Sequence, residues 1–131
     1  MEYLILAYLG DAVYELIVRN HLINKGIKNV NDLQTESLNF VSAKSQRKLL
    51  EKLEQENILT ETELDIVKKG RNAKMHRSKN NDIVTYHKAT GFECLIGYLY
   101  QNDKNRLNEI MEKILWEYVE KTFLMNWSLL K

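Results

Sequence analysis

The chain contains no proline and only five glycines among its 131 residues, and this scarcity of helix-breaking residues most constrains its fold. Proline removes a backbone donor and interrupts helices, and glycine weakens helix interiors, so a chain nearly without them favours long helices with short connections. Apolar residues also recur at three- and four-residue steps, the period of a helix face rather than of a strand. The sequence therefore predicts an all-α fold, in a single domain over residues 1–131.

Capping residues indicate where several of the helices begin. Asn31 or Asp32, Ser42 and Asp103 can each accept a hydrogen bond from a free backbone N–H of a first turn. Thr60-Glu61-Thr62-Glu63 has the spacing of a capping box. The first expected helix covers 2–24, and the second runs from its cap at Asn31 or Asp32 through Leu38. A third helix starts at Ser42 and a fourth runs from Thr60 towards Gly70. The last two cover 83–101 and Asp103 to about Phe123. Residues 71–82 are polar without a period, which indicates a loop or a frayed helix end.

Two carboxylates stand out because each lies in an apolar, helix-like run beside glycine. Asp11 follows Gly10 within Leu9-Gly10-Asp11-Ala12-Val13, and Glu93 lies between Gly91 and Gly97. A charge in apolar surroundings is costly unless something compensates it. A glycine inside a helix is destabilising by about 1 kcal/mol relative to alanine, so it indicates a packing or functional reason such as a close backbone approach. If the two carboxylates meet in the fold, they make a site for a hard cation.

Plainer interpretations of these acidic residues stay open. Glu15 shares a helix face with Asp11, and a solvated acidic face accounts for Glu15 on its own. Glu93 is equally well explained as a buried glutamate paired with a lysine or an arginine. The metal candidates are therefore Asp11 and Glu93, with Glu15 as a weaker third.

A dense basic stretch, Lys68–Lys79, carries six lysines and arginines and no acid, although the net charge of the whole chain is only +1. Such a run is commonly a solvated loop. It can also contact the phosphates of a nucleic acid, with an affinity that falls steeply with salt. The candidate residues for such phosphate contacts are Lys44, Arg71, Asn72, Lys74 and Arg77.

Other functional classes find little support. The single cysteine, Cys94, lies in an apolar run and is expected to be a small buried residue in a reducing compartment. No signal peptide and no run long enough to cross a membrane is present, so we expect a cytoplasmic protein without membrane partners. The histidines lack the spacing of a zinc site.

The motifs together resemble the ribonuclease III family. Leu6-Ala7-Tyr8-Leu9-Gly10-Asp11-Ala12-Val13 is similar to the first acidic motif of its catalytic domains, and Phe92–Tyr100 is similar to the second. The short Mini-ribonuclease III branch is the best match, on the basis of Val41–Gln46, Lys69–Lys74 and Ala89-Thr90-Gly91-Phe92-Glu93. The resemblance covers nearly the whole chain.

The resemblance implies a homodimeric, all-helical endonuclease that cuts double-stranded RNA, with Asp11 and Glu93 as the catalytic metal ligands. It implies Mg²⁺ as the cofactor, with Mn²⁺ as a possible substitute, and maturation of large-subunit (23S) ribosomal RNA ends as the role. Because this branch has no appended double-stranded-RNA-binding domain and none is expected here, a ribosomal protein is a possible helper in substrate selection.

The chain departs from the wider family at two positions. Ala7 stands where the larger enzymes carry a glutamate, and Thr90 stands where they carry an aspartate. Because Mg²⁺ readily keeps water ligands, few protein ligands suffice, and the number of metal ions stays open. A catalytically inactive helical RNA-binding or ribosome-assembly module is the alternative function, and a plain helical dimerisation domain is a weaker third.

Overall fold

The computed structural model describes residues 2–73 and 82–115, and every regular element in these two ranges is a helix. The helices are α1 (Tyr3–Asn24), α2 (Val30–Val41), α3 (Ala43–Gln55), α4 (Glu61–Asn72) and α5 (Ile83–Asn102), followed by a helix over 104–115. The prediction of an all-α fold is confirmed. The sequence predicts that this last helix continues to about Phe123, but the residues after 115 lie outside the part of the chain that the structure describes.

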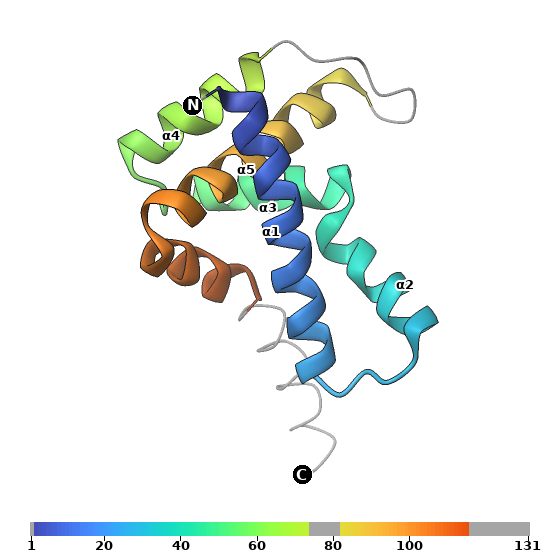
Figure 1. Ribbon diagram of the computed structural model, residues 1–131. Coiled ribbons are helices and arrows are strands. Elements are labelled where there is room, and N and C mark those ends of the chain that lie inside the picture. Colours follow the sequence, from blue (N-terminus) through green and yellow to red (C-terminus); the bar gives the residue numbers. More distant parts are fainter. Residues whose placement is uncertain (1, 74–81, 116–131) are drawn as a thin grey trace.

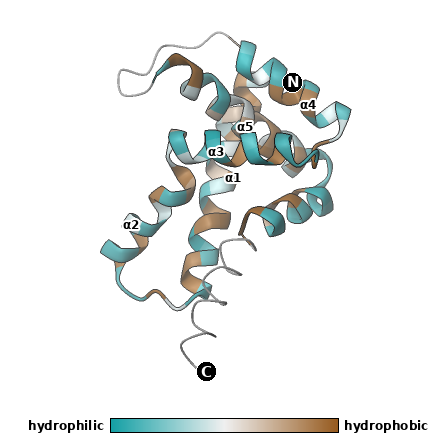
Figure 2. Ribbon diagram, turned by 180° about the vertical axis from the view of Figure 1, so that it is seen from behind, coloured by the Kyte–Doolittle hydropathy of each residue, from teal (hydrophilic) through white to brown (hydrophobic). Residues whose placement is uncertain are grey.

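Helix α5 is the centre of the molecule, and it packs against α1, α3 and α4 (Figure 1). Its buried residues point in several directions around the helix, as expected for a helix enclosed by its neighbours. Phe92, Leu95 and Ile96 are fully buried within a core that also includes Tyr14 of α1 and Leu50 of α3. Helices α2 and α4 show alternating hydrophilic and hydrophobic bands, as amphipathic helices do (Figure 2).

Helices α1 and α5 touch backbone to backbone, and glycine makes this contact possible. A Cβ atom placed on Gly10 would overlap the carbonyl oxygen of Glu93 and lie 2.9 Å from the backbone nitrogen of Gly97. A Cβ atom on Gly97 would overlap the carbonyl oxygen of Leu6. The expectation that Gly10 marks a close approach of another backbone is confirmed.

A second glycine pair brings α4 onto the other side of α5. A Cβ atom on Gly70 would lie 2.7 Å from the Cβ atom of Cys94, and one on Gly91 would lie 2.7 Å from the carbonyl oxygen of Val67. Cys94 is fully buried at this crossing, as its apolar surroundings in the sequence indicate. The segment of α5 that carries Glu93 is thus held between α1 and α4.

Most of the expected caps are present. The hydroxyl of Ser42 accepts from the backbone N–H of Ser45, and Asp103 accepts from the backbone N–H of Arg106 at 3.0 Å. The capping box at Thr60 forms with both of its hydrogen bonds. The prediction for α2 was wrong at its start, because Asn29 caps this helix through its side chain.

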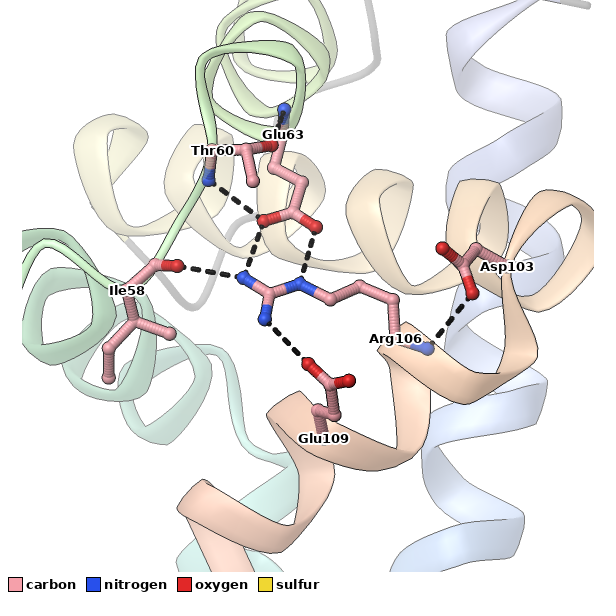
Figure 3. Close-up of polar contacts among 6 residues, drawn as sticks. All are labelled: Ile58, Thr60, Glu63, Asp103, Arg106 and Glu109. Carbon is pink, nitrogen blue, oxygen red and sulfur yellow. Dashed lines mark hydrogen bonds and ion pairs between the residues drawn. The ribbon is translucent and has the colours of Figure 1, made fainter.

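Arg106 joins the last described helix to α4 through a partly buried ion pair (Figure 3). Its guanidinium donates to both carboxylate oxygens of Glu63, at 2.8 and 3.0 Å, and also to the carbonyl oxygen of Ile58 at 2.7 Å. Burial alone would raise the pKa of Glu63, but hydrogen bonds from Arg106 and from the backbone of Thr60 outweigh it, and the pKa is lowered. One carboxylate therefore serves the capping box and the contact between two helices.

Within the described residues, no helix is both long and apolar enough to cross a membrane.

Candidate functional site

Asp11 and Glu93 meet where α1 crosses α5. Their carboxylates are within hydrogen-bonding reach of each other, although the two residues lie on different helices. The geometry follows from the glycine contact, because Gly10 precedes Asp11 and touches the backbone of Glu93 itself. The structure thus brings together the two residues that the sequence singled out.

The raised pKa of Glu93 indicates that no positive charge of the described residues compensates this acidic pair. Burial and, after it, the neighbouring Asp11 carboxylate raise the pKa of Glu93 to about 8, against a smaller lowering by the side chain of Gln46. Two carboxylates this close disfavour each other's ionised form. Among the described residues, the groups that shift the pKa of Glu93 include no lysine and no arginine, so the interpretation as a buried ion pair is not supported.

Gln46 is the third polar residue of the site, and sequence reasoning missed it. It lies in the first turns of α3, is 2% exposed, and donates its side-chain amide to the carbonyl oxygen of Val41 at 3.3 Å. The same side chain lies near the Glu93 carboxylate and lowers its pKa. One signal was available in the sequence, because Gln46 falls on the apolar stripe that continues through Leu49, Leu50 and Leu53 at helical spacing.

Glu15 takes a different role from the other two acids. Its carboxylate accepts a hydrogen bond from Arg19 at 2.9 Å, in an ion pair within α1 whose two side chains are largely exposed. This contact matches the solvated acidic face that the sequence favoured for Glu15 alone. It makes Glu15 the weakest of the three metal candidates.

The two positions where the chain lacks a family carboxylate belong to the packed interior. Ala7 is buried in a small apolar cluster with Leu6, Ile66 and Cys94. Thr90 is also buried, and its hydroxyl donates to the carbonyl oxygen of Tyr86 at 2.9 Å. In the part of the chain that the structure describes, no three histidine, cysteine, aspartate or glutamate residues gather into a cluster, so the acidic pair stands without further carboxylates.

The described RNA-binding candidates lie on α3 and α4. Arg71 runs beside the segment of α5 that carries Glu93, since a Cβ atom on Gly91 would lie 2.9 Å from its Cγ atom. Asn72 follows it and is exposed, and Lys44 is exposed in the first turn of α3. Lys74 and Arg77 lie outside the described residues. One cation of the basic stretch, Lys69, pairs with Asp65 at 2.9 Å.

The site suits a hard divalent cation. Asp11 is exposed, Glu93 is partly buried, and both supply carboxylate oxygens, the ligand type that Mg²⁺ and Mn²⁺ prefer. The Oε1 atom of Gln46 is buried and has no hydrogen-bond partner among the described residues. Buried polar atoms are usually satisfied, so this oxygen is an acceptor available to something that enters the site.

Known proteins of the same kind were found by sequence and by structure. The ribonuclease III domain profile matches residues 4–104. A protein named Mini-ribonuclease 3 from Acholeplasma laidlawii is 46% identical over 111 residues, which cover 85% of this chain and 89% of that protein. Another with this name, from Brevibacillus brevis, is 49% identical over 112 residues, covering 84% and 82%. A crystal structure of a Fusobacterium nucleatum protein matches with a TM-score of 0.77 at 28% identity, covering 86% of this chain and 92% of that one.

The fold, the acidic pair and these similarities agree, and the chain belongs to the ribonuclease III family. Its relatives place it in the Mini-ribonuclease 3 branch of that family.

Proposed function

We propose that this member of the ribonuclease III family is an endonuclease that cuts double-stranded RNA, with a divalent cation held by Asp11 and Glu93. The observation that carries the proposal is the contact between these two carboxylates at the glycine crossing of α1 and α5. A pure RNA-binding module gains nothing from placing one acid beside another, because RNA is itself a polyanion and the pair repels it.

The residues of the chain divide the work between holding a cation and holding RNA. Asp11 and Glu93 would hold the cation, which when bound would supply positive charge to offset the negative charge that develops on the phosphodiester during cleavage. The same charge would draw Glu93 into its ionised form, against its present tendency to keep a proton. Mg²⁺ is the proposed ion, and Mn²⁺ is a substitute with the same oxygen preference.

The basic candidates are proposed to hold the phosphate backbone of the duplex. Arg71 lies next to the α5 segment of the site, and Lys44 is exposed in the first turn of α3, the helix that also carries Gln46. These positions support the proposal that both contact the phosphate backbone of a bound strand. We expect recognition to follow the shape of the A-form helix, because its major groove is too deep and narrow for side chains to read the bases. Lys74 and Arg77 are proposed to extend this surface.

The proposed active form is a homodimer. One face of α1 exposes Ile5, Tyr8 and Leu16, which lie at helical spacing, and Tyr8 is 85% exposed. A continuous apolar stripe of this kind marks an interaction surface. A second copy is the proposed occupant, because Asp11 lies one turn from Tyr8, and two chains meeting here would present two acidic sites to the two strands of one duplex.

The cellular role that we propose is maturation of the ends of 23S ribosomal RNA in the cytoplasm, with a ribosomal protein as a possible helper. The family resemblance supports this role. The proposed substrate is an RNA duplex within the ribosomal precursor.

The decisive test compares cleavage of a long RNA duplex at low salt by the wild type and by Asp11→Asn, with Mg²⁺ or with EDTA. We expect Mg²⁺-dependent cleavage that falls at least about a hundredfold in Asp11→Asn, in line with the loss of one electrostatic stabiliser at a reacting centre. Asp32→Asn, an exposed acid in the first turn of α2, is the matched control and should cut like the wild type. Full activity of Asp11→Asn would overturn the proposal, and RNA binding without any cleavage would favour the inactive assembly module instead.

A further inference from the structure

Gln46 lies behind Glu93 in a way that suits a supporting role in cation binding. Its side chain is 2% exposed, and its amide nitrogen is anchored on the carbonyl oxygen of Val41, where α2 ends. The side chain of Gln46 is also close enough to the Glu93 carboxylate to lower its pKa, as a donor near the ionised form does. A buried donor with one fixed anchor restricts the orientations that its second partner can take.

The position is unusual for a glutamine that only fills the core. Its helical neighbours on the same stripe of α3 are Leu49, Leu50 and Leu53, so a leucine or a methionine would fit the pattern. A buried amide whose oxygen lacks a partner is destabilising relative to a satisfied one. The Oε1 atom of Gln46 has no partner among the described residues. A polar group retained at such a cost is expected to serve the site that it faces.

We propose that Gln46 is a positioning residue that holds the Glu93 carboxylate in the orientation in which it binds the divalent cation. It acts through Glu93 and does not touch the RNA. This inference rests on the proposed function, because it assigns a support to the cation site formed by Asp11 and Glu93. Partners that orient a metal ligand typically change metal affinity or activity by about 10–100-fold when they are removed.

The test is Gln46→Met, which keeps the volume and the unbranched shape of the side chain but removes its donor. Gln55→Met is the matched control, because Gln55 is an exposed glutamine at the other end of the same helix. Mn²⁺ binding is measured directly on each purified protein by titration calorimetry without RNA. Duplex cleavage is then measured as a function of Mn²⁺ concentration.

We expect Gln46→Met to bind Mn²⁺ about 10–100-fold more weakly than the wild type. Excess Mn²⁺ should restore its cleavage, and the KM for RNA at saturating Mn²⁺ should be unchanged. A merely structural glutamine predicts a different result, namely a changed melting temperature with unchanged Mn²⁺ affinity, and that result would overturn the inference. If the wild type binds Mn²⁺ and cuts RNA while Gln46→Met binds equally well, only this inference fails. If the wild type binds no divalent cation, the proposed function fails with it.

Discussion

At the residue scale, the acidic pair combines two side chains that would repel each other if both were ionised. Burial and the Asp11 carboxylate raise the pKa of Glu93 from its ordinary value of 4.5 to about 8. Without a cation, the folded protein therefore keeps a proton that the unfolded chain releases. Protonation and cation binding are alternative ways to neutralise the same site.

This competition predicts how the stability of the cation-free protein depends on pH. Below about pH 4.5, Glu93 is protonated in both the folded and the unfolded protein, so it does not change the free energy of unfolding. As the pH rises towards 8, only the folded protein retains this proton, and the free energy of unfolding falls. Glu93→Gln is neutral throughout and should lack this component of the fall. We expect its stability advantage over the wild type to grow between pH 5 and pH 8 in EDTA, measured by urea denaturation.

The control for that experiment is Glu112→Gln, which removes an exposed acid from the last described helix. Its stability should follow the wild type at every pH. Parallel curves for Glu93→Gln and the wild type would contradict the raised pKa.

The acidic pair was predictable from the sequence, whereas its buried partner was not. Asp11 and Glu93 could be identified from the sequence because charged residues and glycines are both unusual in apolar helices. Gln46 carried only the weak signal of one polar residue on an apolar stripe, and many helices tolerate such a residue. Which residue lies behind Glu93 depends on how α3 packs on α5, and this packing is a long-range property that the local pattern does not contain.

At the element scale, the helix starts show what local sequence can determine. Ser42, Thr60 and Asp103 were predicted as caps and are caps. Helix α2 begins before its predicted cap, since Asn29, Asn31 and Asp32 are all competent and the sequence does not rank them. The packing of Leu33 against the core is absent from the local signal.

The ion pair between Arg106 and Glu63 makes a prediction at this scale. Arg106→Met would leave the Glu63 carboxylate, which is 5% exposed, buried without its cation. Losing one partner of a buried pair costs about 3–5 kcal/mol, so we expect a destabilisation of that size in denaturant unfolding at neutral pH. The deficit should shrink at acidic pH, where Glu63 takes up a proton.

Arg19→Met provides the comparison, because Arg19 also pairs with a glutamate but does so at the surface of α1. Exposed pairs contribute about 0–1 kcal/mol, so this variant should be nearly as stable as the wild type. If both variants lose the same free energy of unfolding, the burial of Glu63 does not make its ion pair more important for stability than the exposed pair.

At the scale of the whole molecule, the sequence predicted helices but not their arrangement. The strongly apolar character of 83–101 indicated a buried helix, and the glycines indicated close contacts, yet neither feature said which helices would meet. The structure places α5 in the centre with α1 and α4 on it (Figure 1). The exposed apolar face of α1 likewise becomes visible only after the buried face has been identified.

That exposed face leads to the prediction about assembly. Leu16 is 61% exposed on α1, so Leu16→Arg should leave the fold intact but shift the protein from dimer to monomer in sedimentation equilibrium. Leu38→Arg changes a leucine on α2 that is 58% exposed and should leave the mass unchanged. A monomeric wild type, or a Leu16→Arg protein that still dimerises, would contradict the proposed interface.

The glycine contact between α1 and α5 also has a consequence for redesign. The spacing of α1 and α5 at Asp11 and Glu93 is set by direct contact between the two main chains. No side chain lies between them at Gly10 and Gly97 whose replacement by a larger or smaller one would change this spacing. Replacing core side chains elsewhere, such as Leu50 or Leu95, should therefore change melting behaviour while leaving the spacing of the two acids almost unaltered. A thermostable variant can be sought by repacking the interior, provided that Gly10 and Gly97 are kept.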